Sequence, residues 1–122
     1  ALKILKSKDV KVNMTLVFSP MQALACAKLG ADFVSPFLGR LDDTQSSGLE
    51  ILEQIIQIYE NYDFKTQVLA ASIRSVDHVV NSALLGSDIA TISPKVFKKM
   101  LKHPLTDIGL AKFLEDYKNS QK

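Results

Sequence analysis

Short apolar runs alternate along the chain with longer segments of helical periodicity. The short runs are rich in β-branched and small apolar residues, as in mostly buried strands, and cover residues 10–18, 32–35, 66–71 and 88–92. Between them, apolar side chains recur three or four residues apart, as in Leu52, Ile55, Ile56 and Tyr59. This strict alternation of strands and helices predicts an α/β fold with a parallel sheet.

Serine residues mark the starts of three predicted helices, at Ser19, Ser47 and Ser93. A serine hydroxyl can accept a hydrogen bond from the first turn of a helix, and the proline that follows two of these serines suits the first helical position. After Pro104, we expect Thr106 to cap a final helix.

An internal repeat predicts the architecture more closely. Leu29-Gly30-Ala31-Asp32 returns 56 residues later as Leu85-Gly86-Ser87-Asp88, which corresponds to two units of 28 residues. A (β/α)8 barrel of about 250 residues uses about 30 residues per unit, so four units predict half of such a barrel. A four-stranded doubly wound sheet is the competing architecture. A half barrel on its own leaves two bare parallel edges, which is a liability.

Composition narrows the class of protein. The 122 residues suit one domain, and 47% of them are hydrophobic, enough for a core. The net charge of +2, with both signs interspersed, argues against a nucleic-acid partner. No apolar run approaches the roughly 18 residues of a membrane span, and no signal peptide is visible. With Cys26 as the single cysteine, we expect a cytoplasmic protein without an internal disulfide.

The stretch 35–43, Ser-Pro-Phe-Leu-Gly-Arg-Leu-Asp-Asp, follows a predicted strand and is expected to be a loop. It contains Arg40, one of only two arginines among the 15 basic residues; the other, Arg74, also follows a predicted strand. Arginine presents a planar fork of donors that suits phosphate. Asp42 and Asp43 have no His or Cys nearby, so we predict no metal site and expect them to be solvated or paired with Arg40.

Ser72 and Arg74 form a Ser-x-Arg pair just before a predicted helix start. The free N–H groups and the dipole of that helix would add to anion binding. Together with Arg40, this pair predicts a monophosphate pocket, against the alternative of an ordinary solvated surface.

Asn13 and Thr15 lie two residues apart in the first predicted strand, so both project to one side. In a barrel that side can be the interior. A buried Asn or Thr needs partners, which a structural network or a polyhydroxylated ligand could supply.

Three motifs, in this order and spacing, resemble the transaldolase family: residues 13–19 (NMTLVFS), 34–43 (VSPFLGRLDD) and 71–74 (ASIR). Residues 103–107 and 113–116 resemble its small-subunit branch, which is related to fructose-6-phosphate aldolase. The resemblance covers the whole chain but only the second half of a family member. It therefore implies a single (β/α)8 TIM-barrel domain of which residues 1–122 supply strands 5–8. Residues 1–9 would be the tail of helix 4 and residues 104–122 the terminal helix.

The resemblance implies transfer of a dihydroxyacetone unit between sugar phosphates in the pentose phosphate pathway, through a lysine Schiff base and without a cofactor. The implied substrates are fructose 6-phosphate, erythrose 4-phosphate, sedoheptulose 7-phosphate and glyceraldehyde 3-phosphate. By the family pattern, Asn13 and Ser35 hold hydroxyls of the three-carbon unit, and Thr15 is catalytic through the water used in proton transfer. Phe37 stands where the related aldolases tend to carry tyrosine, which favours transfer. The family pattern assigns the sugar phosphate to Arg40, Ser72 and Arg74.

One departure from the pattern is the absence of the Schiff-base lysine, which the family places on an earlier strand. Lys95 alone lies near the right end of a predicted strand, and nothing obvious lowers its pKa as amine catalysis needs. We therefore expect the missing N-terminal half to be a partner and this chain to be inactive alone. The alternatives are an aldolase of the same family and a non-catalytic half barrel that binds sugar phosphate. The apolar terminal helix, with Phe113, Leu114 and Tyr117, suggests a homo-oligomer.

Overall fold

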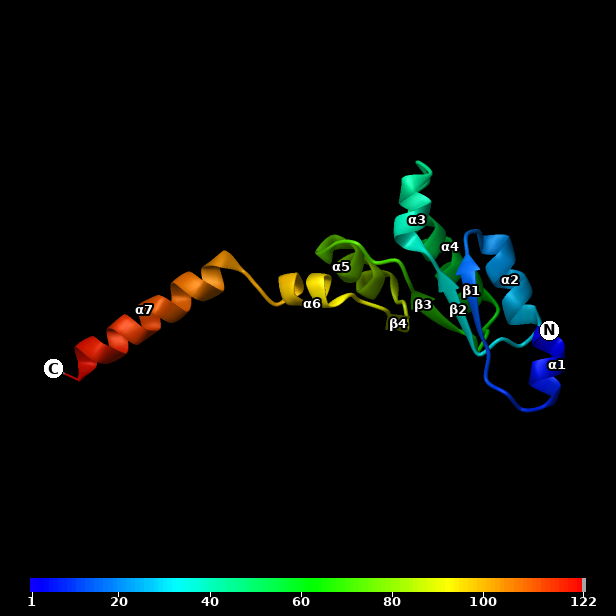
Figure 1. The fold of residues 1–122 in the computed structure, drawn as a ribbon, viewed down its shortest axis with the longest axis horizontal. Helices are drawn as coiled ribbons and strands as arrows, with labels where there is room; N and C mark the ends of the chain where they lie inside the picture. The colour runs from blue at the N-terminus through cyan, green and yellow to red at the C-terminus, as the bar shows by residue number, and fades with distance from the viewer. Residues whose placement is uncertain (122) are drawn as a thin grey trace.

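A computed structural model describes residues 1–121 and contains one parallel sheet (Figure 1). Its four strands are β1 (Asn13–Val17), β2 (Phe33–Pro36), β3 (Gln67–Ala70) and β4 (Ile89–Ala90). They are neighbours in the order β1-β2-β3-β4, and every pair is parallel. The predicted α/β fold with a parallel sheet is confirmed. The strand order does not reverse among the described residues, which argues against the doubly wound alternative.

Helices connect the strands and pack as a layer against the sheet. α2 and α4 contact each other and both contact β2, while α5 contacts α4 and α6. The bounds are α1 (Leu2–Ser7), α2 (Pro20–Lys28), α3 (Leu38–Asp43), α4 (Gly48–Asn61), α5 (Val76–Leu85), α6 (Pro94–Met100) and α7 (Pro104–Ser120).

The core lies between α2, α4 and the sheet. Val34, Leu52 and Ile55 have no exposed surface, and Met14 packs against this cluster from β1. The Tyr59 hydroxyl donates a buried hydrogen bond of 2.7 Å to the carbonyl of Ala23, which joins α4 to α2. Burial raises the pKa of the Tyr59 phenol, because the charged form would lose its hydration.

The internal repeat has the same structural role in both copies. Asp32 Oδ2 accepts the backbone N–H of Val12 at 2.8 Å, and Asp88 Oδ2 accepts that of Val68 at 2.8 Å. Each carboxylate thus joins the segment before one strand to the start of the preceding strand. Lys6 adds an ion pair of 2.8 Å to Asp32. These bonds fix the register of the sheet at its amino end.

The helix caps were predicted in part. The hydroxyls of Ser19, Ser47 and Ser93 each accept a backbone N–H from the first turn of their helix, as expected. The prediction for Thr106 is wrong: His103 caps α7, with its Nδ1 accepting the N–H of Leu105 at 3.1 Å. Pro104 occupies the first helical position, so the cap is the residue before it.

The expectation that 35–43 is a loop is also wrong, because residues 38–43 form α3. No side chain caps α3, so its start carries no sequence signal. Instead, the backbone N–H groups of Leu38 and Gly39 donate to the carbonyls of Ala71 and Ser72, both at 2.9 Å. Contacts with a segment more than 30 residues away in sequence support the first turn of α3.

α7 extends away from the rest of the described chain (Figure 1) and has no buried residue. Its large apolar side chains are all exposed: Leu105, Ile108, Leu110, Phe113, Leu114 and Tyr117. None of the helices in residues 1–121 combines the length and the apolar character that crossing a membrane requires.

Candidate functional site

The candidate site lies where β2 and β3 end. Phe37 pairs with Ala71 as a parallel bridge directly after β2, and the N–H of Gly39 donates to the carbonyl of Ser72. A Cβ added at Gly39 would lie 2.5 Å from both the Ser72 carbonyl oxygen and Arg74 Nε. The start of α3 and the segment after β3 can approach this closely only because residue 39 is glycine.

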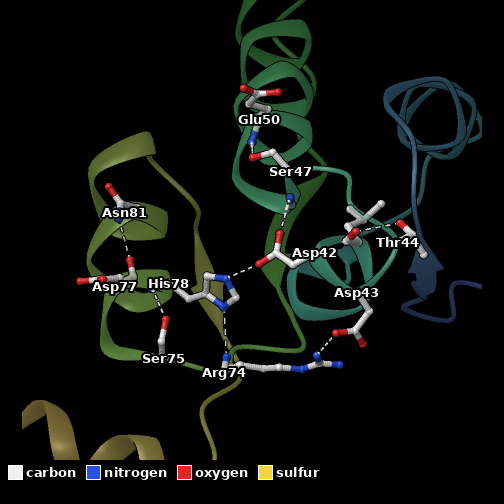
Figure 2. Close-up of polar contacts among 12 residues, drawn as sticks. Asp42, Asp43, Thr44, Ser47, Glu50, Arg74, Ser75, Asp77, His78 and Asn81 are labelled. Carbon is white, nitrogen blue, oxygen red and sulfur yellow. Dashed lines mark hydrogen bonds and ion pairs between the residues drawn. The ribbon is translucent and has the colours of Figure 1, made fainter.

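Arg74 extends from the β3–α5 connection and forms an ion pair with Asp43 at the end of α3 (Figure 2). The hydrogen bond from Arg74 lowers the pKa of the Asp43 carboxyl, and the charge of Arg40 adds to this effect. The same pairing raises the pKa of the Arg74 guanidinium. The sequence predicts that Asp43 is solvated or paired with Arg40. Asp43 is exposed, and it pairs with Arg74 because α3 brings its end to the β3–α5 connection.

Asp42 joins α3 to α4 and α5. The sequence predicts that it, too, is solvated or paired with Arg40. Its Oδ1 accepts the N–H of Gly48 at the start of α4, and its Oδ2 lies 2.8 Å from Nε2 of His78 on α5 (Figure 2). His78 in turn accepts the backbone N–H of Arg74 on its Nδ1, at 3.1 Å. Sequence reasoning missed this connection, because Asp42 and His78 are 36 residues apart.

Arg40 lies on the exposed surface of α3. Its guanidinium carbon is 5.3 Å from the centre of the Phe37 ring, within the range of a cation–π contact. The Phe37 ring also packs at 6.0 Å against that of Phe18, which follows β1. A hollow of about 430 Å³ is lined by Phe18, Arg40, Leu41, Asp43 and Thr44. Arg40 and Arg74 therefore lie at the same end of the sheet, with Asp43 near both.

Ser72 has a left-handed backbone, with φ of 56°. A residue other than glycine or asparagine adopts this conformation at a cost, and such strain is often found at functional sites. This backbone conformation directs the Ser72 carbonyl to the N–H of Gly39. It also sets the direction of the chain that leads to Arg74.

Asn13 and Ser35 come together on adjacent strands. The buried Ser35 hydroxyl donates a hydrogen bond of 2.8 Å to Asn13 Oδ1. Thr15 follows on the same side of β1, where the register shifts between Met14 and Val17. The prediction that this strand is mostly buried is wrong: Asn13, Thr15 and Leu16 are exposed, and only Val17 is buried. Thr15 lines a hollow together with residues of α1 and α2, among them Leu2 and Cys26.

The lysines lie elsewhere. Within residues 1–121, none of them is in a strand or directly follows one. Lys95 is the second residue of α6 and is exposed. No group of three His, Cys, Asp or Glu side chains in the described part of the chain is arranged to hold a metal ion.

Solved structures with a similar arrangement of elements support the fold alone. A variant of flavocytochrome b2 with pyruvate bound matches 75% of this chain and 25% of its own, with a TM-score of 0.63 and 21% sequence identity.

Curated relatives are much closer in sequence. A probable transaldolase of Desulfatibacillum aliphaticivorans is 56% identical over 122 residues, all of this chain and 57% of the relative. A probable transaldolase of Chlorobaculum parvum is 57% identical over 116 residues, 95% of this chain and 52% of the relative. The chain thus spans a little over half the length of these relatives. The family model for transaldolase/fructose-6-phosphate aldolase matches residues 1–122, so the chain belongs to the transaldolase/fructose-6-phosphate aldolase family.

Proposed function

We propose that this chain is the sugar-phosphate-binding half of a transaldolase, corresponding to strands 5–8 of a (β/α)8 barrel. The reaction is transfer of a dihydroxyacetone unit between sugar phosphates. The family membership and the consecutive parallel order of the four strands support this assignment. Residues 1–9 would be the end of barrel helix 4, and residues 104–122 would be the terminal helix.

The placement of Arg40 and Arg74 at one end of the sheet carries the proposal. Asp43 pairs with Arg74, and Asp42 lies near it, whereas Arg40 forms no ion pair within residues 1–121. The Arg40 guanidinium can therefore bind a phosphate monoester together with the remaining donors of Arg74. Asp43 binds one edge of the Arg74 fork and leaves its other donors for an anion. In this proposal, the Ser72 hydroxyl adds a neutral donor beside Arg74.

Asn13, Ser35 and Thr15 would contact the three-carbon part of the substrate. The Ser35–Asn13 hydrogen bond orients the side-chain amide of Asn13, and the amide nitrogen of this exposed residue then offers donors to a ligand. Thr15, further along the same side, would hold the water that moves the proton. Phe37 lies beside Arg40, and its ring has no hydroxyl that could protonate an intermediate.

The Schiff-base lysine would come from the part of the barrel that precedes these strands. Its amine adds to the ketose carbonyl with loss of water, and cleavage of the carbon–carbon bond releases an aldose phosphate. The three-carbon unit left on the lysine then adds to an acceptor aldose phosphate, and water releases the product.

The first experiment uses this chain as it stands. Incubation with fructose 6-phosphate and borohydride should give no increase in mass, because no lysine in residues 1–121 lies at the end of a strand. An adduct on Lys95 would contradict the proposal. Addition of a polypeptide that supplies the first half of the barrel should restore adduct formation, on a lysine of that polypeptide.

The second experiment separates transfer from aldol cleavage in the completed barrel. Release of glyceraldehyde 3-phosphate from fructose 6-phosphate should require erythrose 4-phosphate as acceptor and should yield sedoheptulose 7-phosphate. Release that is equally fast without the acceptor would favour the aldolase alternative. No release in either case, with sugar phosphate still bound, would favour a non-catalytic half barrel.

The remaining features are proposed from the resemblance to the family. We place the protein in the pentose phosphate pathway of the cytoplasm, acting without a cofactor. The exposed apolar side chains of α7 would pack against a second copy of the chain in a homo-oligomer. Sedimentation of the complete protein tests this assembly.

A further inference from the structure

His78 is a histidine to which sequence reasoning assigned no role. Its side chain is 11% exposed, and both ring nitrogens are within hydrogen-bond distance of protein groups. Nδ1 lies 3.1 Å from the backbone nitrogen of Arg74, and Nε2 lies 2.8 Å from Asp42 Oδ2. Neither contact is a backbone–backbone hydrogen bond, so the imidazole itself bridges Arg74 and Asp42.

The two contacts select one tautomer of the His78 imidazole. The Arg74 nitrogen is a backbone N–H donor, so Nδ1 must accept and carries no proton. A neutral imidazole then has its proton on Nε2, where it can be donated to the Asp42 carboxylate. A second proton, on Nδ1, would face the Arg74 N–H and break that bond.

Arg74 is therefore held at two points by neighbouring carboxylates of α3. Asp43 pairs with its guanidinium, while Asp42 orients the ring that accepts its backbone N–H. The other oxygen of Asp42 accepts the N–H of Gly48, so the position of the ring is linked to the start of α4. A shift of the Arg74 main chain would carry the guanidinium away from Asp43.

We propose that His78, as the Nε2–H tautomer, is a positioning residue that fixes the main chain of Arg74 so that its guanidinium is presented to the substrate phosphate. This inference rests on the proposed function, in which Arg74 binds that phosphate. The inference adds the His78 imidazole as the group that determines the position of the Arg74 main chain. The essential feature of the imidazole is the hydrogen-bond acceptor at Nδ1.

Two substitutions of His78 separate the roles of its two ring nitrogens. In His78→Asn, the amide oxygen can take the place of Nδ1 and accept the Arg74 N–H, but the side chain is too short to reach Asp42. In His78→Gln, the amide nitrogen can take the place of Nε2 and donate to Asp42, but the Arg74 N–H loses its acceptor. The matched control is His103→Gln, because His103 Nδ1 also accepts a backbone N–H, at the exposed start of α7.

The experiment measures binding of inorganic phosphate to the full chain by nuclear magnetic resonance, together with hydrogen exchange of the Arg74 amide. We expect His78→Gln to weaken phosphate binding by about tenfold and to speed exchange of that amide. His78→Asn should bind within about twofold of the unchanged chain and keep the amide protected. His103→Gln should change neither quantity.

Nitrogen chemical shifts of the unchanged chain test the tautomer directly and do not depend on whether a variant folds. A proton on Nδ1 of His78 would overturn the proposal, as would equal losses in the Asn and Gln variants. If the unchanged chain binds no phosphate, the proposed anion site is rejected. Even then, a protected Arg74 amide beside an Nε2–H imidazole would support the positioning role of His78.

Discussion

Aspartate side chains hold the chain together at both ends of the sheet, but only those at the carboxyl end contact the side chains of the candidate site. At the amino end, Asp32 and Asp88 accept backbone N–H groups of the neighbouring strand segments. At the carboxyl end, Asp42 and Asp43 face the side chains of His78 and Arg74. The amino end thus fixes main-chain register, while the carboxyl end fixes the positions of functional side chains.

The glycines at the two ends of the sheet are needed for different reasons. Gly30 and Gly86, at the amino end, have φ of 81° and 96°, and Gly30 has no atom within 4 Å of the place a Cβ would take. Gly39 and Gly48, at the carboxyl end, are needed because other backbone atoms approach within 2.5 Å of that place. The amino end needs glycine for turns, and the carboxyl end needs it for the close approach of α3 to its neighbours.

The largest expected effect is that of Gly39→Ala. The added methyl group would meet the Ser72 carbonyl, which is backbone and cannot rotate away, so α3 must move from the β3–α5 connection. We expect a loss of about 1–3 kcal/mol in the free energy of unfolding, measured by urea denaturation.

Gly30→Ala is the matched variant at the amino end. It introduces only an unfavourable backbone conformation, so it should cost about 1–2 kcal/mol and leave phosphate binding unchanged. Gly39→Ala should weaken phosphate binding as well. Equal phosphate affinity in the two variants would remove the distinction between the two ends.

The next effect concerns Asp32 and its dependence on pH. The hydrogen bond from Lys6, followed by that from Val12, lowers the pKa of the Asp32 carboxyl below its ordinary value. A lowered pKa stabilises the folded chain above about pH 4, and this contribution is lost as the pH falls further. Asp32→Asn should therefore destabilise the chain at neutral pH, and the difference from the unchanged chain should shrink on acidification. A difference that stays constant down to about pH 2 would contradict this account.

The smallest effect on stability is expected for Asp43→Asn. The pKa of Asp43 is also lowered, chiefly by Arg74, but the pair is about half exposed and has no backbone partner. Solvent screens such a pair, so the denaturation midpoint at neutral pH should change less than in Asp32→Asn. The measurement is thermal unfolding of the two variants side by side. A larger shift for Asp43→Asn would mean that the Asp43–Arg74 pair contributes more to stability than the bonds of Asp32.

Periodicity and serine caps were sufficient to predict the strands and most helices, because these signals are local. α3 was missed because its first turn is held by the carbonyls of Ala71 and Ser72, and no pattern within residues 35–43 reveals such partners. The arginines were recognised as candidates from residue type and position after strands. The pairing of Arg74 with Asp43 was missed for the same reason as α3, since the partners are 31 residues apart.

α7 has a consequence for handling the chain in solution. Its 17 residues bury no side chain, so the helix is supported by little beyond its own backbone hydrogen bonds. That length is close to the limit at which a lone helix persists in water. Trypsin should therefore cut after Lys112 and Lys118 well before it reaches the strands, and the rate of this cleavage would report whether another surface covers the helix.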